Sequence, residues 1–93
     1  MAKIHRSPSA IAADIRREFP RTAASWPYAR PYVNALAEMV SWQDVYGPAK
    51  ESCREIALRF LSNAGAWRGE RARQIKNEIK AALGLPTAGN FKD

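Results

Sequence analysis

The sequence has little of what most enzymes and secreted domains depend on. Cys53 is the only cysteine, so no intrachain disulfide can form, as is typical of a reducing compartment. His5 is the only histidine and has no second metal ligand at a characteristic spacing. Glycine-rich phosphate loops, cysteine pairs and nucleophile motifs are also missing. The sequence therefore predicts a protein that is not an enzyme and uses neither a metal nor another cofactor.

Long apolar runs are missing too. The longest stretch without a charged side chain covers 81–91 and contains Pro86. A helix that crosses a bilayer needs about 20 apolar residues. No apolar segment of the kind found in a secretory signal follows the basic N-terminus. We therefore expect no membrane partner and a cytoplasmic location.

The length and the net charge of the chain further restrict the classes of protein to which it can belong. A chain of 93 residues fits one domain, 1–93, with 1–6 and 86–93 expected as loose tails. A chain this short has little interior left for an enclosed pocket, so no small-molecule substrate is expected. Fifteen Lys and Arg against nine Asp and Glu give a net charge of +6, which affects solubility and partner choice rather than fold.

Proline and apolar spacing predict two helices in the first half of the chain. Ser7 and Pro8 form a helix-start pair, and apolar residues follow at helical spacing until Pro20, which predicts a helix over 8–19. The second helix is expected to begin at Pro31 and to end near 41. A start at Pro27 would set the ring of Pro31 against a carbonyl four residues back, so 20–30 is expected to be irregular.

Two further helices are predicted in the second half. One covers 48–63, with Pro48 at its start, and the next follows a corner at Trp67 and Gly69 and ends at Gly84. No stretch alternates apolar and polar residues for long enough to predict a strand. The expected fold is all-α, a small four-helix domain in which the last two helices form a C-terminal antiparallel hairpin. The apolar face of 48–63 comprises Ala49, Cys53, Ile56, Ala57, Phe60, Leu61 and Ala64.

Basic residues offer a candidate nucleic-acid surface. At about 100° per residue, Arg73, Lys76 and Lys80 share one stripe of the last helix. Arg16 and Arg17 extend this stripe if the first helix packs beside the last, which would give a non-specific phosphate-binding face. The same stripe is also what an ordinary solvated helix shows. A helix-turn-helix is not favoured, because the connection after 62 is longer than its usual three- to four-residue turn.

Exposed apolar side chains offer candidate protein contacts instead. Trp26 and Tyr28 lie in a proline-flanked segment, and exposed aromatic residues are favoured anchors of protein interfaces. Leu58 lies opposite the apolar face of its helix. The alternatives are a tryptophan that packs over one end of the core and a leucine that is exposed without a role.

The segment 46–83 carries a resemblance, above all in the run LRFLSNAGAWRGE at 58–70 and in Ala72 and Arg73. It resembles small uncharacterised helical proteins encoded in phages and prophages. The resemblance implies an origin and an accessory role, and it assigns no catalytic or binding residue. The combined expectation is a non-enzymatic helical binding module. We expect its partner to be a macromolecule, with a protein favoured over nucleic acid and the oligomeric state left open.

Overall fold

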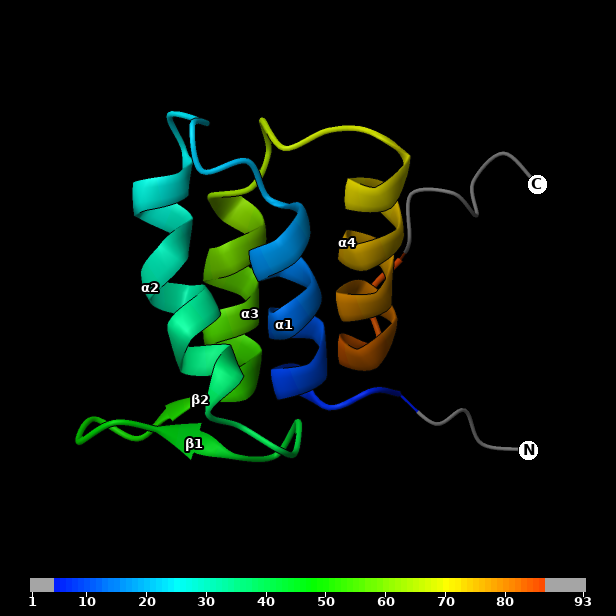
Figure 1. Ribbon diagram of the computed structural model, residues 1–93. Coiled ribbons are helices and arrows are strands. Elements are labelled where there is room, and N and C mark those ends of the chain that lie inside the picture. The colour runs from blue at the N-terminus through cyan, green and yellow to red at the C-terminus, as the bar shows by residue number, and fades with distance from the viewer. Residues whose placement is uncertain (1–4, 87–93) are drawn as a thin grey trace.

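The computed structural model describes residues 5–86, so most of both predicted tails, 1–4 and 87–93, lies outside the described residues (Figure 1). The coarse prediction of a mostly helical, four-helix fold is confirmed. The elements in chain order are α1 (Pro8–Glu18), α2 (Trp26–Ala37), β1 (Val45–Tyr46), β2 (Glu51–Ser52), α3 (Cys53–Ser62) and α4 (Glu70–Leu83).

The first helix follows its local signals closely. The Ser7 hydroxyl accepts a hydrogen bond from the backbone N–H of Ala10 at 3.1 Å, which satisfies a donor that the first turn leaves without an intrahelical partner. Pro8 follows at the start of the helix, where its missing N–H removes no bond. The chain becomes extended at Phe19, directly before Pro20. The prediction of a helix over 8–19 is therefore confirmed to within one residue.

The predicted start of the second helix at Pro31 is wrong. α2 already begins at Trp26, and Pro27 lies in its first turn, where a missing N–H is harmless. Pro31 lies inside the helix and removes one backbone hydrogen bond. Burial of Ala29 and Val33, both 0% exposed, offsets that loss, because α2 packs this face onto the core. The helix also ends at Ala37, before the predicted end near 41.

The segment 45–52 differs most from the sequence prediction. A helix was expected from Pro48, but β1 and β2 form a small antiparallel sheet there, with Val45 opposite Ser52. Gly47 and Lys50 have φ of 76° and 55°, which turns the chain back instead of starting a helix. α3 begins only at Cys53, with Ser52 as its N-cap. Strands of two residues are too short to show the alternation that identifies strands in a sequence.

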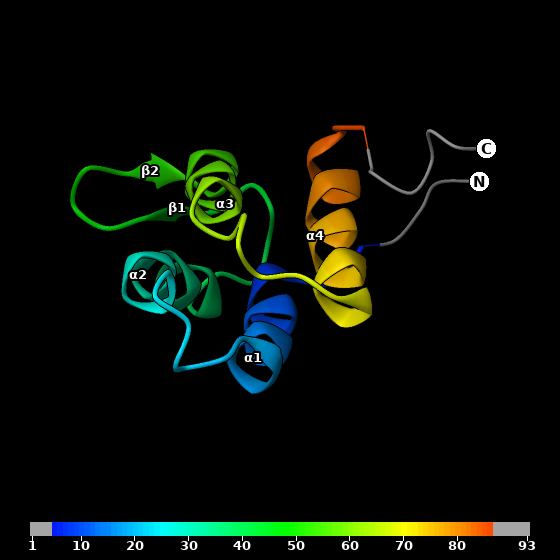
Figure 2. The same ribbon diagram turned by 90° about the horizontal axis from the view of Figure 1, so that it is seen from above.

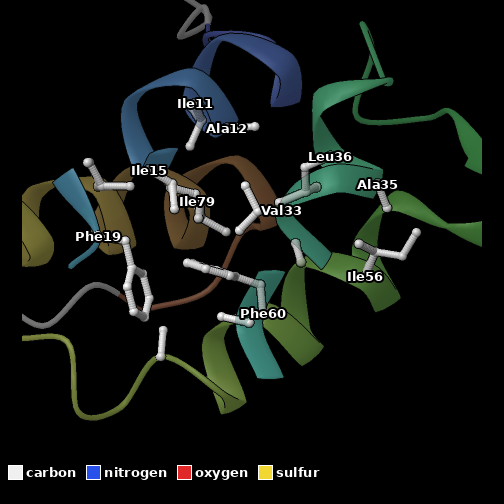
Figure 3. Packing of buried hydrophobic residues seen from close by; sticks show 14 of the residues in the cluster. Ile11, Ala12, Ile15, Phe19, Val33, Ala35, Leu36, Ile56, Phe60 and Ile79 are labelled. Atoms are coloured by element: carbon white, nitrogen blue, oxygen red, sulfur yellow. The ribbon is translucent and has the colours of Figure 1, made fainter. Parts of the chain in front are cut away.

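Most of the predicted apolar face of 48–63 lies in the core, together with buried side chains of α1, α2 and α4 (Figure 3). The exceptions are Ala49, which is exposed in the turn between β1 and β2, and Leu61, which is half-buried. Phe19, Phe60 and Trp67 form an aromatic cluster in which Phe19 and Trp67 stack with ring centroids 4.8 Å apart. Trp67 is 5% exposed and closes the corner between α3 and α4. Cys53 is fully buried, and desolvation raises the pKa of its thiol to about 11, so it behaves as a core residue.

α4 lies beside α1 and is reached from α3 by a connecting segment (Figure 2). α3 and α4 run in opposite directions (Figure 1), and the segment between them crosses over to the start of α4 (Figure 2). α4 packs more extensively against α1 than against α3. A helix hairpin of α3 and α4 as a packing unit therefore stays a prediction. α4 ends at Gly84, whose φ of 77° is the left-handed cap that the sequence predicted.

Candidate functional site

One side of α4 faces α1 and carries a network of ion pairs around a buried carboxylate. Asp14 is 5% exposed and accepts a hydrogen bond from Arg71 of α4 at 3.1 Å. Arg6 lies 2.8 Å from the same carboxylate and also pairs with Glu78 of α4 at 2.6 Å. Arg17 is the third guanidinium on Asp14. The hydrogen bond from Arg6 lowers the pKa of Asp14, while burial acts in the opposite direction. The positive charge of these arginines is therefore paired with carboxylates of the fold itself.

Arg6 lies in the predicted N-terminal tail, yet it is held at both its side chain and its backbone. Besides the two carboxylates, its carbonyl accepts a hydrogen bond from the indole N–H of Trp42 at 2.8 Å. These partners lie between 8 and 72 positions away in the chain. No local sequence signal could therefore identify them.

The other side of α4 borders a surface hollow with a volume of about 530 Å³. We call it the cationic hollow, because its lining holds four basic residues and one carboxylate. Its lining residues are Trp67, Arg68, Gly69, Glu70, Arg73, Lys76, Asn77 and Lys80. Glu70 accepts a hydrogen bond from Arg73 at 2.5 Å, so the single carboxylate is paired with one of the four cations. The other three cations raise the positive potential of the hollow.

Lys76 connects the cationic hollow to the corner at Trp67. Its side chain is half-buried, and its ammonium donates a hydrogen bond to the carbonyl of Trp67 at 2.6 Å. The same ammonium lies 6.0 Å from the centroid of the Trp67 ring. Burial lowers the pKa of Lys76, and the positive charges of Lys80 and Arg68 lower it further. These like charges, which act on one partly desolvated ammonium, favour the arrival of an anion.

Local sequence explains why the hollow forms at this corner. Trp67 packs against Phe19 and Phe60 and thereby fixes the segment that leads into α4. Gly69 then adopts a φ of 112°, a conformation that residues with a Cβ rarely take. Because Lys76 reaches back to the Trp67 carbonyl, the corner and the second turn of α4 are joined. All lining residues of the hollow therefore come from one continuous segment, 67–80.

The structure gathers only part of the predicted nucleic-acid set. Arg73, Lys76 and Lys80 line the cationic hollow together, as the helical stripe predicted. Arg16 points instead toward α2, where it donates to Asn34 at 2.8 Å, and Arg17 pairs with Asp14. The ion-paired, α1-facing side of α4 separates both arginines from the hollow. Arg68 and Glu70 are lining residues that the stripe did not include, although both are next to Gly69, where the sequence predicted the corner before the last helix.

The predicted protein-contact residues differ in exposure. The ring of Trp26 is half-buried, with its centroid 5.2 Å from that of Phe19 and with the guanidinium of Arg21 4.7 Å above it. Tyr28 is 68% exposed, and Leu58 on α3 is half-buried. Only Tyr28 among the three predicted residues therefore presents most of its side chain to solvent.

Two features are absent from the part of the chain that the structure describes. Within 5–86, His, Cys, Asp and Glu side chains form no group of three or more that could hold a metal ion. In the same part of the chain, no helix has both the length and the apolar character needed to cross a membrane. The absence of a cofactor stays a prediction.

No family model, curated protein or solved structure matches this chain. The fold and the site together describe a small helical domain with a cationic hollow beside α4. The geometry of that hollow is what supports the proposal below.

Proposed function

We propose that this chain is a non-enzymatic helical binding module whose cationic hollow holds the phosphate backbone of a nucleic acid. The observation that carries the proposal is the concentration of Arg68, Arg73, Lys76 and Lys80 around one concave surface with a single carboxylate. Protein cations that neutralise phosphates release condensed counterions, which supplies most of the free energy of non-specific binding.

Binding of a phosphate depends on how many basic side chains are not already paired with carboxylates, as well as on their total number. In the described part of the chain, none of the ion pairs involves Arg68, Lys76 or Lys80. Arg6, Arg17 and Arg71, by contrast, all point to Asp14. A phosphate at the hollow therefore gains new charge pairs, whereas one at the α1-facing side of α4 competes with carboxylates that are already in place.

Binding at this surface is expected to be independent of sequence. Lys and Arg side chains that contact phosphates fix position but do not read base edges. Among the lining residues only Asn77 has the amide type that typically pairs with adenine. A cytoplasmic protein of phage or prophage origin with an accessory role, as the sequence resemblance implies, is compatible with such a function and belongs to the same proposal.

A protein partner is the second candidate, which the sequence alone favoured. Its specific support is the exposure of three apolar side chains, with Tyr28 at 68%, Val40 at 76% and Val45 at 56%. Tyr28 lies in the first turn of α2, whereas Val40 lies beyond the last residue of that helix and Val45 begins β1. Because these side chains do not form one patch, the cationic hollow is the better-supported surface.

The test is the salt dependence of binding to a generic DNA duplex. Three to four phosphate contacts predict a slope of log K against log salt of roughly −2.7 to −3.6. The double variant R73E/K80E should bind more weakly on every sequence and flatten the slope by roughly 2, since two contacts are lost. Fluorescence anisotropy at several salt concentrations measures both quantities.

A matched control separates the hollow from overall charge. The variant R16E/R30E changes net charge by the same amount on exposed residues of α1 and α2. It should retain a slope close to that of the wild type. Equal losses in both variants would show that net charge, not the hollow, attracts the nucleic acid. No binding by the wild type at low salt would end the nucleic-acid proposal and leave the protein partner.

A further inference from the structure

The shape of the cationic hollow carries information that its charge does not. A duplex presents a smooth, convex backbone, and a flat basic helix face would meet it equally well. The hollow of about 530 Å³ instead lies within the range of about 300–1,000 Å³ that is typical of small-molecule binding sites, so it has more than enough room for one phosphate group. The structure thus provides a place for a group that enters, rather than one that passes across the surface.

We infer that the cationic hollow takes a terminal phosphomonoester, the phosphate at the end of a nucleic-acid strand, in preference to the internal diesters of the backbone. The inference rests on the proposed function and names the part of the nucleic acid that the hollow holds. The phosphate of a free nucleotide has the same chemistry, so the experiment below includes it as a separate arm.

Charge matching supports a monoester. Four cations and one carboxylate line the hollow, so a group with more negative charge is attracted to it more strongly than a singly charged diester. A phosphomonoester carries about −1.5 to −2 charges at pH 7 and offers three acceptor oxygens. Arg68 and Lys80 both act electrostatically on the ammonium of Lys76, so a group near Lys76 interacts with all three cations at once.

Access supports the same assignment. Burial differs along the lining. Trp67 is buried and Lys76, Asn77 and Lys80 are half-buried, whereas the exposed lining residues are Arg68, Gly69, Glu70 and Arg73. An ideal Cβ added at Gly69 would meet no heavy atom within 4 Å, so this part of the lining is open. A strand end can insert its phosphate toward Lys76 and leave its nucleoside outside. An internal diester carries a nucleoside on both sides, so we expect it to bind the hollow with a less close approach to Lys76.

Lys76 is therefore expected to decide the preference. Its ammonium is partly desolvated beside the Trp67 ring, where charge interactions are stronger than in bulk water. Its hydrogen bond to the Trp67 carbonyl uses only one of three N–H donors, which leaves donors for phosphate oxygens. Lys80 is the neighbouring cation on the same stripe and extends the field along α4.

The experiment compares single-stranded oligonucleotides of one sequence, with a phosphate or a hydroxyl at the 5′ end and a fluorophore at the other. The phosphorylated strand should bind about tenfold more tightly, as expected for one additional charge-assisted contact. Lys76→Gln should abolish this preference, and Lys76→Arg should retain most of it. R16E/R30E, with its changes outside the hollow, should leave the preference unchanged. Circular dichroism establishes that each variant is folded.

The possible outcomes are distinguishable. Equal binding of the phosphorylated and hydroxyl strands overturns the inference and leaves the proposed function intact. A preference that survives Lys76→Gln also overturns it, because the phosphate would then bind elsewhere. No binding of either strand overturns the proposed function itself. Competition by adenosine monophosphate identifies the source of the phosphomonoester. Weak competition assigns the strand end, whereas competition as strong as that of the phosphorylated strand assigns a free nucleotide. Both results support binding of a phosphomonoester.

Discussion

The two sides of α4 carry the same residue types and have different roles. Arg71 on the α1-facing side points to the buried carboxylate of Asp14 and to Glu18. Lys76 on the other side points to a backbone carbonyl and is surrounded by like charges. A count of basic residues treats both sides alike. The comparison shows that tertiary neighbours, rather than helix composition, decide which charges hold the fold together and which are available to a partner.

Both sides of α4 depend on the same hydrophobic core, so a substitution in that core is expected to have the largest effect on stability. Phe60 is fully buried and contacts the aromatic rings of Phe19 and Trp67. Phe60→Ala should lower the free energy of unfolding by about 3–5 kcal/mol, because the large ring leaves a cavity. In a domain of this size such a loss approaches the total stability. Thermal unfolding near the wild-type temperature would show that the two sides do not share this core.

Removal of the central carboxylate should affect stability more than removal of charges from the hollow. Asp14→Asn should lower the free energy of unfolding by about 1.5–3 kcal/mol, because a nearly buried acceptor of several charged hydrogen bonds is weakened. The double variant R73Q/K80Q should change it by less than about 0.5 kcal/mol, since both side chains lie at the surface. Urea unfolding compares the two. Similar losses would remove the distinction between the sides.

The pH dependence of stability sharpens the same contrast. The folded-state pKa of Asp14 is lowered from its ordinary value of 3.8, so its ionised form stabilises the fold at pH values above 3.8. That contribution should be lost as the pH falls below 3.8 and through the folded pKa. Urea titrations between pH 5 and pH 2 should show this loss in the wild type. Asp14→Asn should lack this part of the pH dependence, and an unchanged profile would contradict the role of Asp14.

The smallest expected effect concerns the electrostatics of the hollow itself. The pKa of Lys76 lies below its ordinary value of 10.5, first because of burial and then because of Lys80 and Arg68. Lys80→Gln removes one of these like charges and should therefore raise the pKa of Lys76. Titration of the Lys76 side chain by nuclear magnetic resonance measures the change. An unaltered pKa would place Lys80 too far from Lys76 to belong to the same site.

Local signals predicted the helices where local interactions decide them. Ser7 and Gly84 mark helix ends through their own hydrogen bonds or backbone conformation, and both predictions are confirmed. The predicted start of α2 was wrong because burial in the core outweighs the local unfavourable effect of Pro31. The small sheet at 45–52 was missed because its strands are too short to give a pattern.

The candidate site was predictable only in part, for a similar reason. Arg73, Lys76 and Lys80 follow from helical periodicity alone, which is a local property. The hollow also requires the corner that Trp67 fixes by packing on Phe19, and this contact joins residues far apart in the chain. The separation of Arg16 and Arg17 from α4 likewise depends on their tertiary partners. Periodicity identifies a face, and packing determines what that face becomes.

The central claim is that α4 binds nucleic acid through the cationic hollow, and chemical-shift mapping tests it most directly. A short duplex with a terminal phosphate is added at low salt to the isotopically labelled protein, and the backbone amide shifts are followed. The largest changes should fall within 67–80, with little change at Arg16, Arg17 and Arg30. Changes centred on Tyr28 or spread evenly over the basic residues would contradict the claim, as would a spectrum that the duplex leaves unaltered.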